Sequence, residues 1–322
     1  MPRLSIVIPA LGAWEQLEAT LVSVLGNRPA DTEVVVALHE GYEDPYGLEG
    51  EVRFVRLRSG ATTLVAWNAA IAACRAPLVH LLACGATVGE GWCDAAVGHF
   101  DDARVAAVAP LVLSDGERIG TAGWHYSLGG AANHFAAGKR ADAIGAPDER
   151  WMGPHGAAAF YRLSALAPAP AAFDSTLGDE LAPLDLALRL RQAGYRAILE
   201  PRSRVIIPEL ANFASSALQA ERLFWRHAAH DGSWQPVVAH VGAVALEFAG
   251  SLPRPRSVWQ LAQRIGGIFR LRPSTCAAYR LTPHAVAEPS EALSSNHQFH
   301  SSHGRGFRRA KRGAMSPFAP RK

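Results

Sequence analysis

The chain has 322 residues, of which 49% are hydrophobic, and a formal net charge of +3. This length and composition predict one large domain or two smaller ones with a sizeable apolar core. Seven Lys and Arg residues against two acids lie from His284 to the end, so the preceding residues carry a net charge of −2. This distribution argues against a basic nucleic-acid-binding surface on the folded part and confines the excess positive charge to the tail.

The cysteines and the N-terminus bear on the compartment. The four cysteines form no CxxC pair, and buried reduced thiols are the simplest interpretation of them. The opening MPRLSIVIPA has the pattern of a strand and lacks the charged region and long apolar region of a signal peptide. We therefore expect a cytoplasmic protein, with the inner face of the membrane as a second expected location.

Apolar runs and helical spacing alternate through the first third of the chain. Short apolar runs predict strands at residues 4–8, 33–38, 52–57, 78–83 and 105–113. Apolar residues at helical spacing predict helices at residues 13–25, 62–74 and 91–100. Pro9 is expected to end the first strand. This alternation predicts an α/β fold with a mainly parallel sheet flanked by helices, which binds ligands beyond the carboxyl ends of its strands.

The periodicity is weaker in the second half. Residues 121–150 are rich in Gly, Ala and His and are expected to form a long irregular loop. A further apolar run, a helix, two short strands and a second helix are expected at residues 157–161, 185–193, 196–199, 204–207 and 214–230.

Two C-terminal stretches raise the question of a membrane. Residues 234–252 approach the length of a span but contain Pro236, His240 and Glu247, so a buried or interfacial amphipathic helix is expected. From residue 284 the chain has the composition of a disordered segment. These residues and the 234–252 helix could attach the protein peripherally to acidic lipid; a solvated tail is the alternative, and no specific nucleic-acid partner is expected.

Six segments in the same order resemble family-2 inverting glycosyltransferases of the GT-A fold. They are LSIVIPA (4–10), EVVVAL (33–38), LVAWNAAIAACRAPLVHLLACGATV (64–88), GEGW (89–92), GAAAFYRLSAL (156–166) and FDSTLGDELAPLDLALRLRQAGYRAILEPRSRV (173–205). The resemblance implies a GT-A-like domain at residues 1–212, followed by a helical extension at 213–283 and a basic tail at 284–322. It also implies a nucleotide-sugar donor and transfer of its sugar to an acceptor.

The chain lacks acids where the family carries its chemistry. The aspartate that holds the base corresponds to Leu38 or His39, and the DxD motif that holds Mn²⁺ or Mg²⁺ corresponds to residues 83–85, Ala-Cys-Gly. The pair containing the general base corresponds to Ala182 and Pro183, and the late histidine falls at residues 206–208. We therefore expect no metal site of the family's type and no metal cofactor. Two functions stay open: weak or metal-independent glycosyl transfer, and a non-catalytic pseudoenzyme that binds a sugar, nucleotide or protein partner.

Two places could supply the missing chemistry. Asp179 and Glu180 lie just ahead of the missing pair and are the catalytic candidates, with a solvated turn as the alternative. His155 lies between two glycines that would let a ligand approach, with a solvated loop histidine as the alternative. The candidate nucleotide-sugar-binding residues are Pro9, His39, Asn68, Cys84, His155 and Asp185, of which Asp185 could instead orient a helix.

Other polar residues have simpler interpretations. Arg56 and Arg58 could offset phosphate charge or be exposed cations at a strand edge. His80 lies inside a buried strand and is expected to be a hydrogen-bonded core histidine.

Overall fold

Two β-sheets and the helices packed on them make up the described part of the chain. The computed structural model describes residues 1–12, 14–39, 41–42, 44–166, 171–210, 216–228 and 234–251, with side chains through residue 246. The chain divides into residues 1–284 and 285–322, and every described residue belongs to the first unit. The expected boundary at residue 212 and the tail from residue 284 fall outside the described residues.

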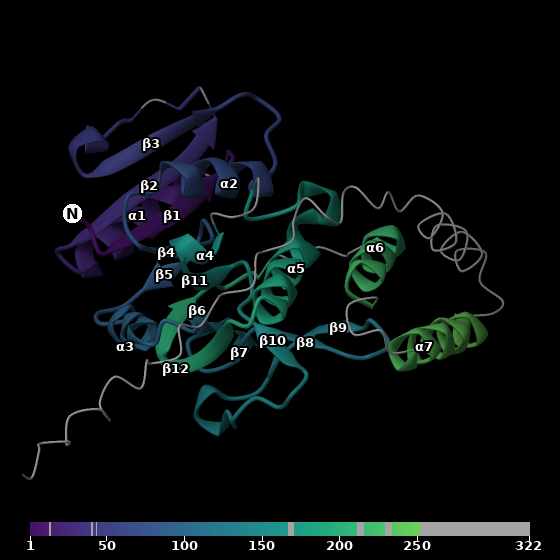
Figure 1. The fold of residues 1–322 in the computed structure, drawn as a ribbon. Helices are drawn as coiled ribbons and strands as arrows, with labels where there is room; N and C mark the ends of the chain where they lie inside the picture. The colour runs from purple at the N-terminus through teal and green to yellow at the C-terminus, as the bar shows by residue number, and fades with distance from the viewer. Residues whose placement is uncertain are drawn as a thin grey trace, which may run out of the picture. The chain divides into compact units, whose positions relative to one another are not determined.

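The larger sheet has, within the described ranges, nine strands in the order β3-β2-β1-β4-β11-β6-β12-β5, with β7 paired to β6 (Figure 1). The strands β3, β2, β1 and β4 are parallel to one another, as predicted. β1 pairs in parallel with both β2 and β4, and β2 pairs in parallel with β3. The strands are β1 (Leu4–Ala10), β2 (Thr32–His39), β3 (Val52–Leu57), β4 (Leu78–Leu82), β5 (Thr87–Val88), β6 (Val105–Leu113), β7 (Ile119–Thr121), β11 (Ala158–Arg162) and β12 (Arg196–Ile206).

Helices cover both faces of this sheet, which is why its central strands are mostly apolar, with Ser5 and His80 as buried polar exceptions. Ile6 and Ile8 of β1 belong to the core that contains α1 (Trp14–Asn27), while Val7 belongs to the opposite core. The opposite core contains α2 (Thr63–Ala73) and α5 (Gly178–Gln192). Successive side chains of a strand point to opposite faces, so a strand between two helical layers buries its side chains in both cores.

The smaller sheet lies in the region that the sequence predicted to be irregular. It consists of β10 (Trp151–Gly153), β8 (Trp124–Tyr126) and β9 (Ala132–His134), all antiparallel. The expectation of a long structureless loop at residues 121–150 was therefore wrong. Strands of three residues are too short to show a period of two, and only their pairing reveals them.

Three further expectations are corrected. Pro9 does not end β1, because it pairs with Ala37; the pairing with β4 already stops at Val7. The helix expected from residue 185 begins at Gly178 and includes Pro183. The two strands expected at residues 196–199 and 204–207 are one strand, β12, whose register against β6 shifts between Glu200 and Arg204. A bulge of this kind keeps a strand paired through residues that look like a break in the sequence.

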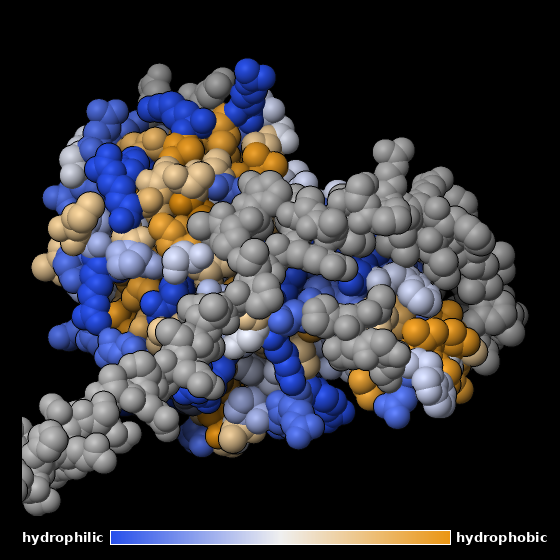
Figure 2. Space-filling view, in the orientation of Figure 1, coloured by the Kyte–Doolittle hydropathy of each residue, from blue (hydrophilic) through white to orange (hydrophobic). Residues whose placement is uncertain are grey.

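The remaining helices lie around the sheet and beyond its edge. They are α3 (Asp94–Gly98), α4 (Leu163–Leu166), α6 (Ala217–Ala228) and α7 (Gln235–Ser251), with short 3-10 helices at Leu48–Gly50, His99–Asp101, Ala141–Ala143 and Ser175–Leu177. Figure 2 shows hydrophobic side chains gathered over α7. Nowhere in the described ranges does a helix combine the length and the apolar character that crossing a bilayer requires.

Candidate functional site

The carboxyl end of β4, residues 83–85, is a packed and uncharged turn, called the β4 turn below. The N–H of Ala83 donates to the carbonyl of Ala157 at 2.8 Å, which fixes the turn beside the start of β11. The N–H of Gly85 donates to Oγ1 of Thr20 on α1 at 2.9 Å, and the φ of +90° at Gly85 suits a glycine. Burial raises the pKa of the Cys84 thiol to about 11, so it is neutral at physiological pH.

The β4 turn does not fit the divalent cation that the fold family implies. Mn²⁺ and Mg²⁺ take oxygen ligands, mostly carboxylates. Residues 83 and 85 offer no side-chain oxygen, and the neutral thiol of Cys84 is a soft ligand. No step of the chemistry is therefore assigned to a metal at this turn.

Three other nucleotide-site candidates lie at or near the same edge of the sheet. Pro9 is buried in β1, and His39 ends β2 with its Nδ1 buried and without a hydrogen-bond partner among the described residues. Asn68 on α2 has another task, since its amide donates to the carbonyl of Phe173 at 2.8 Å and accepts from the N–H of Phe173 at 2.9 Å. It therefore clamps the segment that precedes α5.

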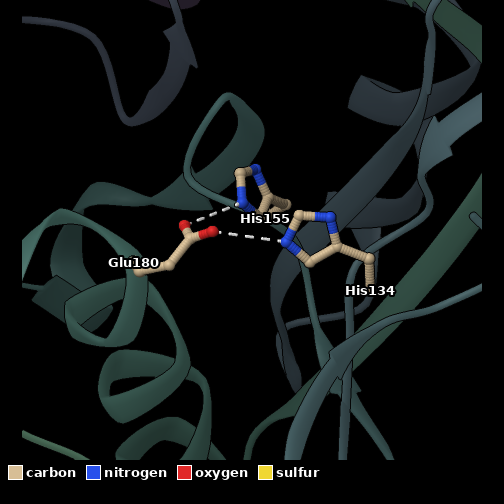
Figure 3. A group of neighbouring side chains, drawn as sticks. All are labelled: His134, His155 and Glu180. Carbon is tan, nitrogen blue, oxygen red and sulfur yellow. Dashed lines mark ion pairs between the residues drawn. The ribbon is translucent and has the colours of Figure 1, made fainter. Parts of the chain in front are cut away.

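A buried carboxylate lies between two imidazoles close to the β4 turn (Figure 3). Nε2 of His134 and Nε2 of His155 each lie 3.4 Å from a different oxygen of Glu180. We call these three residues the Glu180 cluster. Their side chains are 20%, 8% and 10% exposed for His134, His155 and Glu180 respectively. The indole of Trp124 packs against both imidazoles, with ring centroids 4.9 and 5.1 Å apart.

Three separate elements bring the cluster together. His134 ends β9, His155 lies in the connection from β10 to β11, and Glu180 is in the first turn of α5. Gly156 allows this approach, because a Cβ at that position would lie 2.7 Å from Pro183 and 2.9 Å from Trp67. Pro183 of α5 therefore packs against Gly156, where any larger residue would clash. Since Ala157 is bonded to Ala83, the loop that carries His155 adjoins the end of β4.

The hydrogen bonds fix the protonation pattern of the cluster. Nδ1 of His155 accepts the N–H of Ala157 at 3.1 Å, so the proton of the neutral ring is on Nε2 and faces Glu180. Burial lowers the pKa of His155, which keeps the ring neutral. Burial also raises the pKa of Glu180, but the hydrogen bonds from His134 and His155 outweigh it and lower that pKa to about 2. Glu180 is therefore ionised at neutral pH.

Two histidines and a glutamate are also a ligand set for zinc. The three ligand atoms lie within 4.8 Å of one another. A metal on Nε2 of His155 would, however, require the proton on Nδ1, where the Ala157 N–H already points. The geometry favours a carboxylate that faces two imidazole nitrogens at 3.4 Å over a metal centre.

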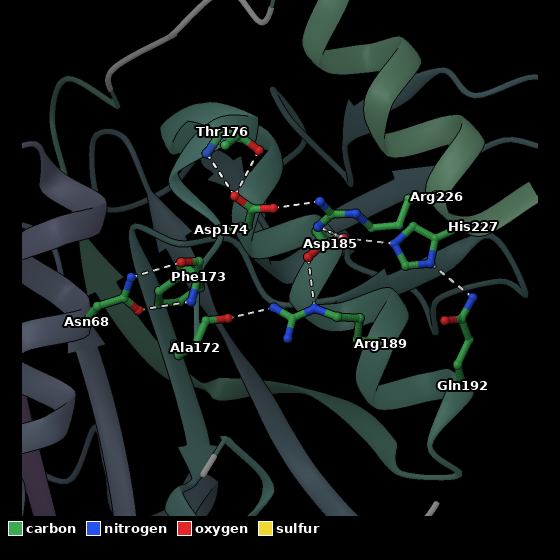
Figure 4. Close-up of polar contacts among 10 residues, drawn as sticks. All are labelled: Asn68, Ala172, Phe173, Asp174, Thr176, Asp185, Arg189, Gln192, Arg226 and His227. Atoms are coloured by element: carbon green, nitrogen blue, oxygen red, sulfur yellow. Dashed lines mark hydrogen bonds and ion pairs between the residues drawn. The ribbon is translucent and has the colours of Figure 1, made fainter. Parts of the chain in front are cut away.

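Asp185 belongs to a second buried network, which joins α5 to α6 (Figure 4). Its Oδ2 accepts from Arg189 at 2.8 Å, and its Oδ1 lies 3.1 Å from Arg226 and 2.9 Å from Nε2 of His227. Arg226 also bonds to Asp174 at 2.6 Å. Burial raises the pKa of Asp185, but His227 and the two arginines lower it further, so the net shift is downward. Both oxygens of Asp185 are thus occupied by side chains.

The sequence candidates therefore have different surroundings. Glu180 and His155 are brought together and buried, which rules out the solvated alternatives considered for them. Asp179 is partly exposed, and its carboxylate makes no hydrogen bond or ion pair to another described residue. His80 is a core histidine as expected: it stacks on Phe160, burial lowers its pKa to about 3, and its Nε2 accepts from Trp92. Sequence reasoning missed His134, since nothing near it in the chain marks it out.

Comparison with known proteins identifies the fold. No protein-family model and no curated protein sequence matches the chain. The structure of GalNAc-T7 with UDP, GalNAc and Mn²⁺ is similar with a TM-score of 0.53 and 14% identity, over 70% of this chain and 48% of that one. The mannosyltransferase PcManGT from Pyrobaculum calidifontis, with GDP-Man and Mn²⁺, has a TM-score of 0.49 and 16% identity, over 85% and 81%. The chain has a GT-A-type glycosyltransferase fold, as the resemblance implied, and spans about half the length of the first structure.

Proposed function

We propose that this protein binds a nucleotide sugar at the carboxyl edge of β1, β2 and β4 and transfers the sugar to an acceptor activated by Glu180 and His134. The observation that carries the proposal is the ionised, buried Glu180 between two imidazoles, beside the strand end where the donor of a GT-A fold is expected. The nucleotide is assigned to the end of β2 at the half-buried His39, whose buried Nδ1 lacks a partner among the described residues.

The base of the reaction is assigned to the pair rather than to the carboxylate alone. A carboxylate with a pKa of about 2 is a weak base, but it can orient an imidazole and stabilise its charged form. Glu180 accepts Nε2–H of His134, which leaves the lone pair of the ring on Nδ1. His134 is also the most exposed member of the cluster. The proton acceptor is therefore Nδ1 of His134.

The chemical step is a single displacement. The acceptor oxygen forms a bond to the anomeric carbon, the bond from that carbon to the diphosphate breaks, and the acceptor proton moves to His134. The negative charge on the leaving diphosphate needs cations because the β4 turn supplies no metal ligands. We assign this role to Arg56 and Arg58, which are exposed near the carboxyl end of β3.

A non-catalytic binding protein is the second candidate. The neutral β4 turn and the 8% exposure of Glu180 favour it, because a base must reach the hydroxyl that it deprotonates. Such a protein would use the same edge to hold a nucleotide or a nucleotide sugar without turnover. The two candidates predict the same binding and different rates.

Release of nucleoside diphosphate from UDP- and GDP-sugars, with mixed sugar acceptors and without metal, tests the proposal. Glu180→Gln and His134→Phe should each lower the rate about 100- to 10,000-fold, the range of general-base catalysis. Glu117→Gln, an exposed acid far along the chain, is the control and should retain the wild-type rate. Asp179→Asn separates the two neighbouring acids and should change the rate little.

Two outcomes would decide against transfer. Calorimetric binding of UDP or GDP without measurable release in any acceptor mixture would favour the binding protein. Absence of binding at millimolar nucleotide would reject both candidates.

A further inference from the structure

The outer face of α7 carries an apolar stripe. Trp234, Val238, Val241 and Ala245 follow one another at helical spacing, and the N–H of Val238 bonds to the carbonyl of Trp234, which places Trp234 in register with the helix. Trp234, Val238 and Val241 are 71%, 58% and 59% exposed, and Ala245 is exposed as well. We call these four residues the α7 stripe. Exposed apolar stripes of this kind usually mark an interaction surface.

The inner face of α7 is fixed, so the stripe keeps its outward direction. His240 stacks on Phe224 of α6 at 3.7 Å between ring centroids, and its Nδ1 donates to the carbonyl of Gly129 at 2.8 Å. Its Nε2 lies 3.1 Å from the carboxylate of Glu221. Gly129 also packs closely, since a Cβ there would lie 3.3 Å from Ala239 and Ala243. The helix is therefore held by one side and presents the other.

The net charge of the sequence changes from negative to positive after the last residue of α7. Residues 252–322 contain 13 of the 32 Lys and Arg residues and 2 of the 29 acids. The preceding 251 residues consequently have a net charge of −8, against +11 for the residues that follow α7. The first part of that segment, residues 252–283, has six arginines and no acid, interspersed with Val258, Trp259, Leu261, Ile265, Ile268, Phe269 and Leu271.

We propose that the α7 stripe and the arginine-rich sequence after it bind the surface of an anionic lipid bilayer. The stripe supplies apolar side chains, with a tryptophan of the kind found at membrane interfaces, for the boundary between headgroups and acyl chains. The arginines supply attraction to acidic headgroups, about 1 kcal/mol for each cation near the surface. Attachment lies along the surface, because no described helix is fit to cross the bilayer.

Charge decides between a bilayer and other occupants. A second copy would bring a second sequence with the same excess of positive charge, and a nucleic acid would leave the apolar residues without a partner. An anionic bilayer satisfies the apolar stripe and the arginines together. The proposal concerns attachment and does not depend on the proposed glycosyl transfer.

Co-sedimentation of the full chain with phosphatidylcholine vesicles, with and without phosphatidylglycerol, tests the proposal. We expect binding to the anionic vesicles only, weakened by added salt because salt screens the arginines. Val238→Glu with Val241→Glu should lower the partition of the protein into anionic vesicles at least about tenfold, because two apolar side chains that would insert into the bilayer become charged. Val22→Glu on α1 is the control, because Val22 is an even more exposed valine (76%), and it should leave binding unchanged.

A second variant tests the arginines of residues 252–283 and leaves the α7 stripe unchanged. Arg264→Gln, Arg270→Gln and Arg272→Gln together should lower the partition to anionic vesicles at least about tenfold. Equal binding to neutral vesicles, or anionic binding that the valine variant leaves intact, would overturn the proposal. A dimer in light scattering that Val238→Glu and Val241→Glu dissolve would assign the stripe to a second copy instead.

Discussion

The β4 turn and the Glu180 cluster adjoin each other, and they differ in every electrostatic respect. The β4 turn has no charged side chain and is held by backbone N–H groups that donate to Ala157 and Thr20. The Glu180 cluster holds an ionised carboxylate, buried and supported by two imidazoles. In a fold where charge is expected at the end of the fourth strand, this chain has its charge at the start of α5.

The two regions satisfy their polar groups in different ways. The β4 turn has no side-chain charge, and α1 provides the hydroxyl of Thr20 as the acceptor for the N–H of Gly85. Glu180 is costly to bury and persists only because its oxygens face two histidines. The stability of the two regions should therefore respond to different perturbations.

The largest expected change in stability is at Asp185, a buried carboxylate further along α5 from the Glu180 cluster. Asp185→Asn leaves the buried Arg189 with an uncharged partner and Arg226 with the carboxylate of Asp174, which should lower the free energy of unfolding by about 3–5 kcal/mol. Urea unfolding followed by circular dichroism measures it. Asp148→Asn removes an acid that is 46% exposed and is the control, with little expected change. Similar losses in both variants would contradict the account of this network.

Acid pH should also distinguish the two regions. The folded pKa of Glu180, about 2, lies below its ordinary value of 4.5, so its stabilising contribution is present above pH 4.5 and is lost as the pH falls toward 2. The lowered pKa of Asp185 and of His155 have the same sign. Glu180→Gln should remove part of this dependence, on the order of 2 kcal/mol between pH 5 and pH 2.5.

Thermal unfolding across that range, for wild type and Glu180→Gln, provides the measurement. Thr20→Val is a control in this series, because the β4 turn contains no titrating acid. Parallel pH curves for wild type and Glu180→Gln would mean that Glu180 is not held ionised in the fold.

A smaller change in stability is expected at the β4 turn. Thr20→Val keeps the shape of the side chain but leaves the N–H of Gly85 without its acceptor, which should cost about 1–2 kcal/mol of stability. Thr20→Ser retains the hydroxyl and should keep more of the stability. Chemical denaturation of both variants compares them, and equal losses would show that packing rather than the hydrogen bond fixes the turn.

The smallest expected effect is that of a divalent cation. Since the β4 turn offers no carboxylate, Mn²⁺ should change neither the affinity for UDP nor its enthalpy in calorimetric titration. Cys84→Ala should likewise leave the affinity for UDP unchanged with and without Mn²⁺. Micromolar Mn²⁺ or Zn²⁺ binding that Glu180→Gln abolishes would instead make the Glu180 cluster a metal centre.

The sequence by itself determined the core of the fold. The apolar runs of β1, β2, β3 and β4 predicted one parallel sheet, because a strand covered by helices on both faces is a nearly continuous apolar run. The missing acids at the β4 turn could likewise be read from the chain, since a metal site needs ligands of a particular type. It also singled out Glu180 and His155 as separate candidates.

Only the tertiary structure decided which residues form a site. His134, His155 and Glu180 lie on β9, in a loop and on α5, and the pairing of three-residue strands that carries His134 into place leaves no periodic signal. The start of α5 was hidden as well, because Pro183 lies inside the helix, where a proline usually indicates a helix end. The periodic pattern of apolar residues in a sequence predicts which face of a helix or strand is buried. It does not predict which distant residues pack against that face, because those contacts depend on the tertiary structure.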